Sequence, residues 1–270
     1  MSDVKVSTKS KQFCLKLIDL LRRLGPELVR GDRTLSLSLL GYQHVQSCLH
    51  ALHSHSQDLH SLFCLDLETL ENILGRVQIL SLTGRSDPEK GWINLEVFKL
   101  LTELELKQVS ISEFSNLQSL AGHLTSLKIC WSEVDVEDVE DVLAGVRGLG
   151  GGAPWVHLTT LVLSHNNLTQ LSSALSLTPH LHTLDATHNH IYNAPGLICL
   201  ERLHSLYLSF NSLTKIPMLS SESNLTTLSL GYNRLETISG LENILTLECL
   251  DLSGILFFNL IGGYMYLKFP

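Results

Sequence analysis

The sequence is short of basic residues. Lys and Arg number 19 against 27 Asp and Glu, and the 270 residues carry a formal net charge of −8. Because phosphates attract a basic face, this balance argues against nucleic-acid binding. Apolar stretches of about 18 residues are missing as well, so no membrane-spanning helix is expected. Charges at Lys16, Asp19 and Arg22 interrupt the N-terminal apolar residues and argue against a secretory signal peptide.

Paired cysteine motifs are missing too. The six cysteines are spread along the chain, and none forms a C-x-x-C pair. Without a secretion sequence, we interpret them as free and mostly buried thiols, and we expect a cytoplasmic protein.

A histidine-rich segment allows two interpretations, a zinc site or the polar end of a helix or a loop. Its spacing does not fit a tetrahedral metal site, so we favour the polar segment and expect no metal. The residues concerned are Cys48, His50, His53, His55 and His60.

Catalytic and cofactor motifs are also missing. No nucleophile elbow, H-E-x-x-H zinc motif or pair of carboxylates stands at a plausible position. The glycines at 148 and 150–152 lack the Lys-Ser/Thr pair that follows in a phosphate-binding loop. We therefore expect a protein that is not an enzyme and holds no cofactor.

The sequence does contain an internal repeat. Four segments match the template L-x-x-L-x-L-x-x-N-x-L, and their starts lie 23, 22 and 22 residues apart. They are LTTLVLSHNNL, LHTLDATHNHI, LHSLYLSFNSL and LTTLSLGYNRL, beginning at Leu158, Leu181, Leu203 and Leu225. The ninth place holds asparagine in each of them: Asn166, Asn189, Asn211 and Asn233.

This repeat has a direct physical interpretation. Side chains alternate along a strand, so the two leucines of L-x-L point inward. Successive strands pair in parallel, and the buried asparagines form a structural ladder that bonds the backbone of the turns. After the asparagine of each repeat, apolar residues recur about every three positions, which predicts short helices or 3₁₀ turns on the convex side. The fold class is therefore an α/β leucine-rich repeat solenoid with 22-residue repeats and a parallel concave sheet.

Weaker copies and an N-terminal helical region flank these repeats. Copies begin at Leu101, Leu124 and Leu247, and a degenerate strand is expected at Gln78–Leu82. Apolar spacing predicts helices at 11–24, stopped by Gly25-Pro26, and at Asp66–Gly75, which would cap the first strand edge. The expected organisation is a helical cap at 1–75, a solenoid at 76–254 and an apolar tail at 255–270.

The repeat that begins at Leu124 is longer than the others. The next repeat begins 34 residues later, at Leu158, so about 12 residues are inserted relative to a 22-residue period. Val136, Val139, Leu143 and Val146 lie at helical spacing, and acidic residues stand at the expected helix start. We favour a longer convex helix with a glycine-rich exit loop; a docking loop for a partner is the alternative.

The predicted concave face, opposite the leucines, consists of places 3, 5 and 7 of each repeat. Its residues are small, polar and mostly neutral, and Tyr207 is among them. Place 8, at the rim, holds a ring in five successive repeats: Trp131, His165, His188, Phe210 and Tyr232. Aromatic residues anchor many interfaces, so we predict that these rings and Tyr207 bind a protein partner. Two alternatives are that the rings only pack on one another, or that His188 and His190 sense pH or hold a metal.

Particular segments carry a family resemblance beyond the repeat. FCLKLIDLLRRLGPELVRGDRTLSLSL, LTSLKICWSEVDVEDVEDVLAG and APWVHLTTLVLSHNNLTQL resemble the N-terminal region of the serine/threonine-protein kinase 11-interacting proteins. The leucine-rich region of nischarin is similar around SLKICW. The resemblance implies a cytosolic, non-catalytic scaffold that binds a serine/threonine kinase and influences its location. A nischarin-like trafficking or cytoskeletal adaptor is the alternative.

The chain ends in LDLSGILFFNLIGGYMYLKFP, residues 250–270. Ile255 stands where the template requires asparagine, and the apolar run that follows is too short and too broken to span a bilayer. It also lacks the polar outer face of a C-terminal cap. We interpret this segment as the aberrant tail of a truncated or misspliced product.

Overall fold

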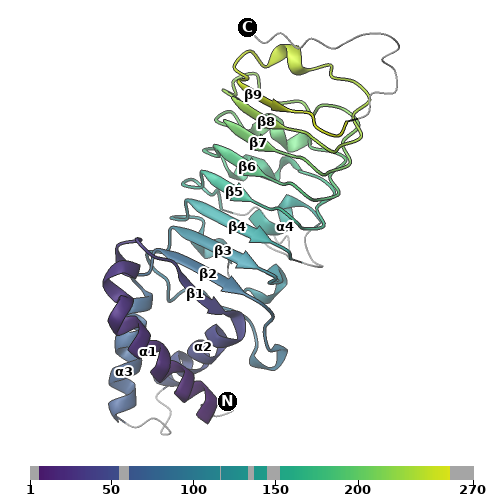
Figure 1. Cartoon of the computed structure of the whole chain (residues 1–270). Coiled ribbons are helices and arrows are strands. Elements are labelled where there is room, and N and C mark those ends of the chain that lie inside the picture. The colour runs from purple at the N-terminus through teal and green to yellow at the C-terminus, as the bar shows by residue number, and fades with distance from the viewer. Residues whose placement is uncertain (1–5, 55–60, 116, 133–136, 145–152, 256–270) are drawn as a thin grey trace. The chain divides into compact units, whose positions relative to one another are not determined.

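The computed structural model describes residues 6–54, 61–115, 117–132, 137–144 and 153–255 (Figure 1). The chain divides into two compact units, Met1–Leu120 (unit 1) and Ala121–Pro270 (unit 2). The interpretation of residues 256–270 as an aberrant tail falls outside the described residues, as do His55, His60 and the glycine-rich part of the insertion.

Three helices begin unit 1: α1 (Thr8–Val29), α2 (Leu39–His53) and α3 (Ser61–Leu74) (Figure 1). Helix α1 contacts both of the others. Its buried residues recur at helical spacing and form one apolar face, which explains why the segment folds as an amphipathic helix. The larger ones are Cys14, Leu17, Ile18, Leu21 and Leu28.

The predicted end of the first helix at Gly25-Pro26 is wrong. Helix α1 continues through Pro26 to Val29. A proline in a helix removes one N–H and leaves the carbonyl four residues earlier, here that of Arg22, without its helical partner. Both Pro26 and Arg22 are exposed, so water can bond that carbonyl and the helix tolerates the proline in its last turn.

Unit 1 also contains three parallel strands, β1 (Leu35–Ser38), β2 (Ile79–Thr83) and β3 (Glu103–Lys107). The degenerate strand expected near Gln78–Leu82 is thus confirmed as β2. Strand β1 lies within the segment assigned to a helical cap, so that segment supplies a strand as well as helices. The inward leucines are in register across the three strands: Leu35, Leu80 and Leu104 in one row, and Leu37, Leu82 and Leu106 in the next.

Unit 2 stacks six parallel strands, each paired with the next. Each begins two residues after the first leucine of its repeat, as the template predicts. The second residue of each strand is a leucine, and in β4 to β8 this leucine is buried. Short 3₁₀ helices follow several strands, including Ser173–Leu177, Pro195–Cys199 and Leu241–Asn243. The strands are β4 (Ser126–Cys130), β5 (Thr160–Val162), β6 (Thr183–Asp185), β7 (Ser205–Tyr207), β8 (Thr227–Ser229) and β9 (Cys249–Asp251) (Figure 1).

The asparagine at place 9 joins neighbouring repeats. Asn189 Oδ1 accepts from Leu168 N at 3.1 Å, while Nδ2 donates to Leu163 O at 2.9 Å and to Ala186 O at 3.0 Å. Leu163 and Leu168 belong to the preceding repeat, and Ala186 to its own. The same double role recurs at Asn166, Asn211 and Asn233.

The insertion after β4 contains a short helix, α4 (Val139–Leu143), capped by Asp138 and Asp141. The described helix is shorter than the one predicted, and Val136 and Val146 fall outside the described residues. Trp155 is fully buried, and its Nε1 donates to Leu143 O at 3.0 Å. This bond ties the end of α4 to the point where the regular repeats resume.

Among the described residues, no helix has the length and apolar character needed to cross a membrane.

We expect the Asn189→Ala substitution to lower the free energy of unfolding by about 2 kcal/mol. It leaves the buried Leu168 N without its acceptor, whereas Leu163 O and Ala186 O each lose one of two amide donors and keep those of Asn166 and Asn211. Urea denaturation followed by circular dichroism measures this loss. His190→Ala is the matched control: His190 is the exposed neighbour, and its loss should change stability by less than about 0.5 kcal/mol. Equal effects of the two substitutions would contradict a structural role for the ladder.

Candidate functional site

The five predicted rings of place 8 form one continuous stack in unit 2, which we call the ring stripe. The centroid distances run 4.0 Å from Trp131 to His165, 4.2 Å to His188, 4.1 Å to Phe210 and 4.4 Å to Tyr232. Neighbouring planes lie within 10° of parallel. The stripe is open to solvent, with Trp131 52% exposed, Phe210 42% and Tyr232 53%.

A left-handed backbone conformation holds every ring of the stripe. The φ angles lie between 54° and 61°, a region that bulky residues rarely adopt and that costs about 1–2 kcal/mol per residue. The main-chain ladder continues through these residues: His165 N donates to Thr187 O at 3.0 Å, and Phe210 N to Gly231 O at 2.9 Å. These bonds and the ring contacts offset the conformational cost, because an aromatic pair contributes roughly 0.5–1.5 kcal/mol beyond its burial.

The ring stripe ends where place 8 holds glycine. Gly254 has φ 69°, so it continues the same backbone turn without a side chain. A Cβ at Gly254 would lie 2.6 Å from Tyr232 Cδ1, which is closer than atoms can approach. The Tyr232 ring therefore lies directly against the Gly254 backbone, and a side chain here would displace it.

Serine and threonine fill more than half of the strand face beside the ring stripe. Its outer rows, places 3 and 7, hold serine and threonine with Cys130, Cys249 and Gly231. The middle row, place 5, carries the larger groups: Lys128, Val162, Asp185, Tyr207, Ser229 and Asp251 on strands β4 to β9. The structure thus places Tyr207 in the middle of this face, where the row at place 7 separates it from the rings with which it was grouped.

Two aspartates on this face are bonded differently. Asp251 is saturated, since Oδ1 accepts from Ser253 and Oδ2 accepts from Ser229 Oγ at 2.9 Å. These bonds, with Ser253 contributing most, lower the pKa of Asp251. Asp185 Oδ1 accepts from Thr187 N at 3.0 Å and from Thr187 Oγ1 at 2.8 Å, and Oδ2 bonds no described residue.

Burial in the stack lowers the pKa of His165, and the neighbouring His188 lowers it further, while Asp185 opposes the shift. The stack therefore favours the neutral imidazole at His165. Because both faces of His165, His188 and Phe210 are covered by adjacent rings, an incoming group meets only the edges of these three rings.

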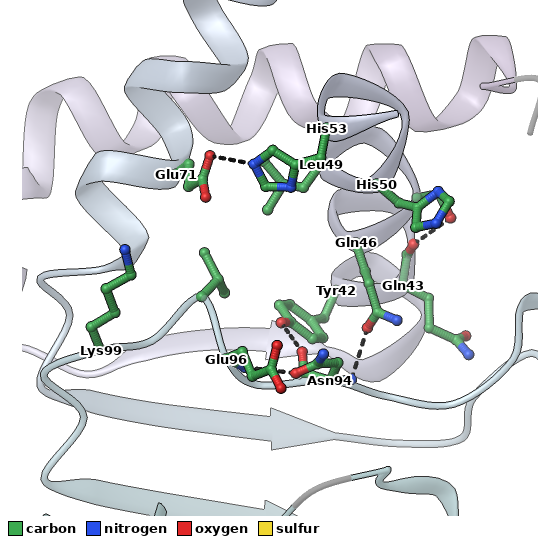
Figure 2. Close-up of a pocket in the computed structure, with 12 residues that line it drawn as sticks. Tyr42, Gln43, Gln46, Leu49, His50, His53, Glu71, Asn94, Glu96 and Lys99 are labelled. Carbon is green, nitrogen blue, oxygen red and sulfur yellow. Dashed lines mark hydrogen bonds and ion pairs between the residues drawn. The ribbon is translucent and has the colours of Figure 1, made fainter. Parts of the chain in front are cut away.

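Unit 1 contains a separate cavity of about 520 Å³ (Figure 2). One wall is held by the side chain of Gln46, whose Oε1 accepts from Asn94 N at 3.0 Å and whose Nε2 donates to Trp92 O at 2.7 Å. The lining carries both acidic and basic groups, so it singles out neither an anion nor a cation. The ionisable groups of the lining are His50, His53, Glu71, Glu96 and Lys99.

The described part of the histidine-rich segment is the end of α2. Cys48 is buried, and His53 bonds Glu71 across the cavity at 3.1 Å (Figure 2). The part of the chain that the structure describes contains no group of three or more His, Cys, Asp or Glu side chains placed to hold a metal ion.

Three features of the two units were not predicted from the sequence. The positive φ at place 8 was not foreseen, although glycines at the same place, Gly84 and Gly254, were an indication. No role was assigned to Asp185, which the strand register sets directly beside Tyr207. The cavity of unit 1 depends on tertiary contacts of Gln46 and Tyr42 that leave no trace in the local pattern.

Comparison with known proteins agrees with this geometry. The family model described as "Leucine Rich Repeat" matches residues 157–177. Two solved leucine-rich structures share the fold at 22% identity over 71% of the chain: a protein of Leptospira interrogans, with a TM-score of 0.54 and 46% of its own chain covered, and an internalin of Listeria monocytogenes, with 0.51 and 52%.

Two curated relatives are more similar in sequence. Human serine/threonine-protein kinase 11-interacting protein is 32% identical over 199 residues, and its mouse counterpart is 31% identical over 188 residues. These matches cover 68% and 63% of this chain but only 18% and 17% of the relatives' own length. The chain is therefore a leucine-rich repeat protein, and its sequence is similar to a limited part of the serine/threonine-protein kinase 11-interacting proteins.

Proposed function

We propose that this chain is a non-catalytic scaffold that binds a protein partner through the ring stripe and the adjoining Tyr207. The observation that carries the proposal is the row of five stacked rings, of which four are exposed and His165 is partly exposed. Their mutual contacts fix them before any partner arrives, so association costs little side-chain entropy. Aromatic anchors of this kind supply much of the binding energy at protein interfaces.

The shape and chemistry of the surface also favour binding over catalysis. The strand face is open and lined by short hydroxyl side chains, whereas most enzymes enclose their substrates in a concave pocket. Hydroxyl groups and ring edges suit the polar, close-fitting contacts of a protein partner.

We further propose a serine/threonine kinase as the partner, and the cytoplasm as the location where the scaffold influences that kinase. The similarity to proteins named for their interaction with serine/threonine-protein kinase 11 supports this choice. Because the chain matches less than a fifth of their length, the proposal concerns only a contact made by the leucine-rich repeats.

Replacing three rings of the stripe together, as Trp131→Ala, Phe210→Ala and Tyr232→Ala, should weaken binding to purified serine/threonine-protein kinase 11 at least tenfold. The substitutions remove exposed aromatic anchors and leave the asparagine ladder intact. Biolayer interferometry with the immobilised chain measures the dissociation constant, and circular dichroism confirms that the variant is folded.

The matched control replaces three other exposed apolar residues of unit 2, as Tyr192→Ala, Met218→Ala and Leu245→Ala. They are 62%, 77% and 80% exposed, more than the rings, and lie outside the stripe. Their loss should leave affinity unchanged. A larger effect from the control than from the ring variant would show that the partner binds outside the ring stripe. If the wild-type chain does not bind the kinase, the proposed partner is wrong.

The stack should also make stability depend on pH. Since the folded protein holds the pKa of His165 below its usual value of about 6.5, the unfolded chain takes up the proton first as pH falls. The free energy of unfolding should therefore decrease below about pH 6.5. In His165→Phe, which keeps a ring but cannot titrate, urea denaturation at pH 7.5 and 5.5 should show a smaller decrease than in the wild type.

The control for this measurement is His190→Gln, which removes an exposed histidine outside the stripe. It should leave the pH dependence close to that of the wild type. An unchanged pH dependence in His165→Phe would show that the stack does not disfavour the charged imidazole.

A further inference from the structure

Asp185 and Tyr207 are adjacent at the centre of the strand face of unit 2. They occupy place 5 of β6 and β7, and the strand register sets them opposite one another. These are the third and fourth of the six strands of this unit (Figure 1). Residues that dominate binding energy cluster near the centre of an interface, where the surrounding contacts exclude water.

The carboxylate of Asp185 keeps one oxygen for a ligand. Thr187 occupies Oδ1 with two hydrogen bonds, and among the described residues no donor reaches Oδ2. Asp251 lies in the same row and also has a hydroxyl residue two positions later. Its Oδ1 accepts from Ser253 and its Oδ2 accepts from Ser229. Of these two aspartates, only Asp185 therefore has a carboxylate oxygen that no described donor bonds, and a cationic ligand can bond that oxygen.

Tyr207 is partly exposed and is not part of the ring stack. The interior rings of the stripe are stacked on both sides, whereas Tyr207 makes no ring contact with any described aromatic side chain. A planar cation over a tyrosine face, within about 6 Å of its centroid, is attracted by the ring quadrupole. An oxygen acceptor beside a partly exposed tyrosine ring suits a guanidinium, which is planar and donates in its plane.

The surroundings leave room for a long side chain. Val162 lies opposite Asp185 on the other side, and Ser229 lies opposite Tyr207. The flanking rows hold only Thr183, Ser205, Thr187 and Ser209 on these two strands. Lys128 lies two strands from Asp185, a separation of roughly 10 Å. It is too distant to neutralise the carboxylate directly.

We propose that Asp185 and Tyr207 form the anchor site for an arginine side chain of the protein partner. The guanidinium donates to Asp185 Oδ2 and lies against the Tyr207 ring, between the row of Thr183 and Ser205 and the row of Thr187 and Ser209. The net charge of −8 favours the approach of a basic partner. This inference rests on the proposed function, since it specifies what the bound protein presents to the same face.

A small-molecule probe tests the site without the partner. N-acetyl-arginine amide is titrated into the full ¹⁵N-labelled chain, and N-acetyl-citrulline amide serves as the neutral control of almost equal shape. The arginine compound should shift the backbone amides around Asp185 and Tyr207 with millimolar affinity, because a single exposed charge pair and one cation–π contact are weak. The citrulline compound should not shift them at the same concentration.

Two matched variants identify the carboxylate. Asp185→Asn keeps an oxygen for Thr187 but loses the charge, so the affinity for the arginine compound should fall at least fivefold. Asp251→Asn makes the same change in the same row and should leave the affinity unchanged. Equal binding of arginine and citrulline, shifts centred elsewhere, or no difference between the two variants would overturn the assignment.

The same variants then separate this inference from the proposed function. With serine/threonine-protein kinase 11 as the probe, Asp185→Asn should weaken binding about tenfold and Asp251→Asn should not. If the kinase binds both variants as well as the wild type, the arginine anchor is wrong while the proposed partner stands. If the kinase does not bind the wild type, the partner is wrong, and the arginine titration alone decides the anchor.

Discussion

The buried asparagine is the constraint on which unit 2 depends. When the chain leaves a strand and turns across the core, it carries peptide groups into an apolar interior, where an unpaired donor or acceptor costs about 1–3 kcal/mol. An asparagine amide can both donate and accept, and here it does so toward two consecutive repeats. The ladder therefore sets the register between repeats as well as closing each turn.

The exposed surface follows from this buried turn. For the residue at place 9 to point inward, the residue before it adopts a left-handed conformation, and its side chain is directed outward at the rim of the sheet. Since all repeats turn in the same way, the rings at this place arrive at the spacing of the strands and stack. The left-handed backbone of these residues thus places the rings in a rigid row, and the proposed binding surface depends on the core beneath it.

The parts of the fold that repeat were predictable, and the parts that occur once were not. Each strand of unit 2 begins two residues after the first leucine of its repeat, because the period places inward leucines and the turn together. Helix α2 and the passage of α1 through Pro26 depend on local exposure and packing that periodicity does not report. Similarly, the row of rings was visible in the alignment, but the pairing of Asp185 with Tyr207 required the register between strands, and their role in binding remains a proposal.

The long repeat after β4 has a consequence for how such a chain can change. About 12 additional residues separate β4 from β5, yet Ser126 still pairs with Thr160 and Leu127 with Leu161. The buried Trp155, which bonds Leu143 at the end of α4, returns the chain to the core before the next strand starts. The number of residues between one strand and the next can therefore vary, whereas one residue gained or lost between the first leucine and the asparagine of a repeat would shift the ring of that repeat out of line with its neighbours. Insertions are therefore tolerated in the connections that follow the asparagine, whereas the segment from the first leucine to the asparagine must keep its length.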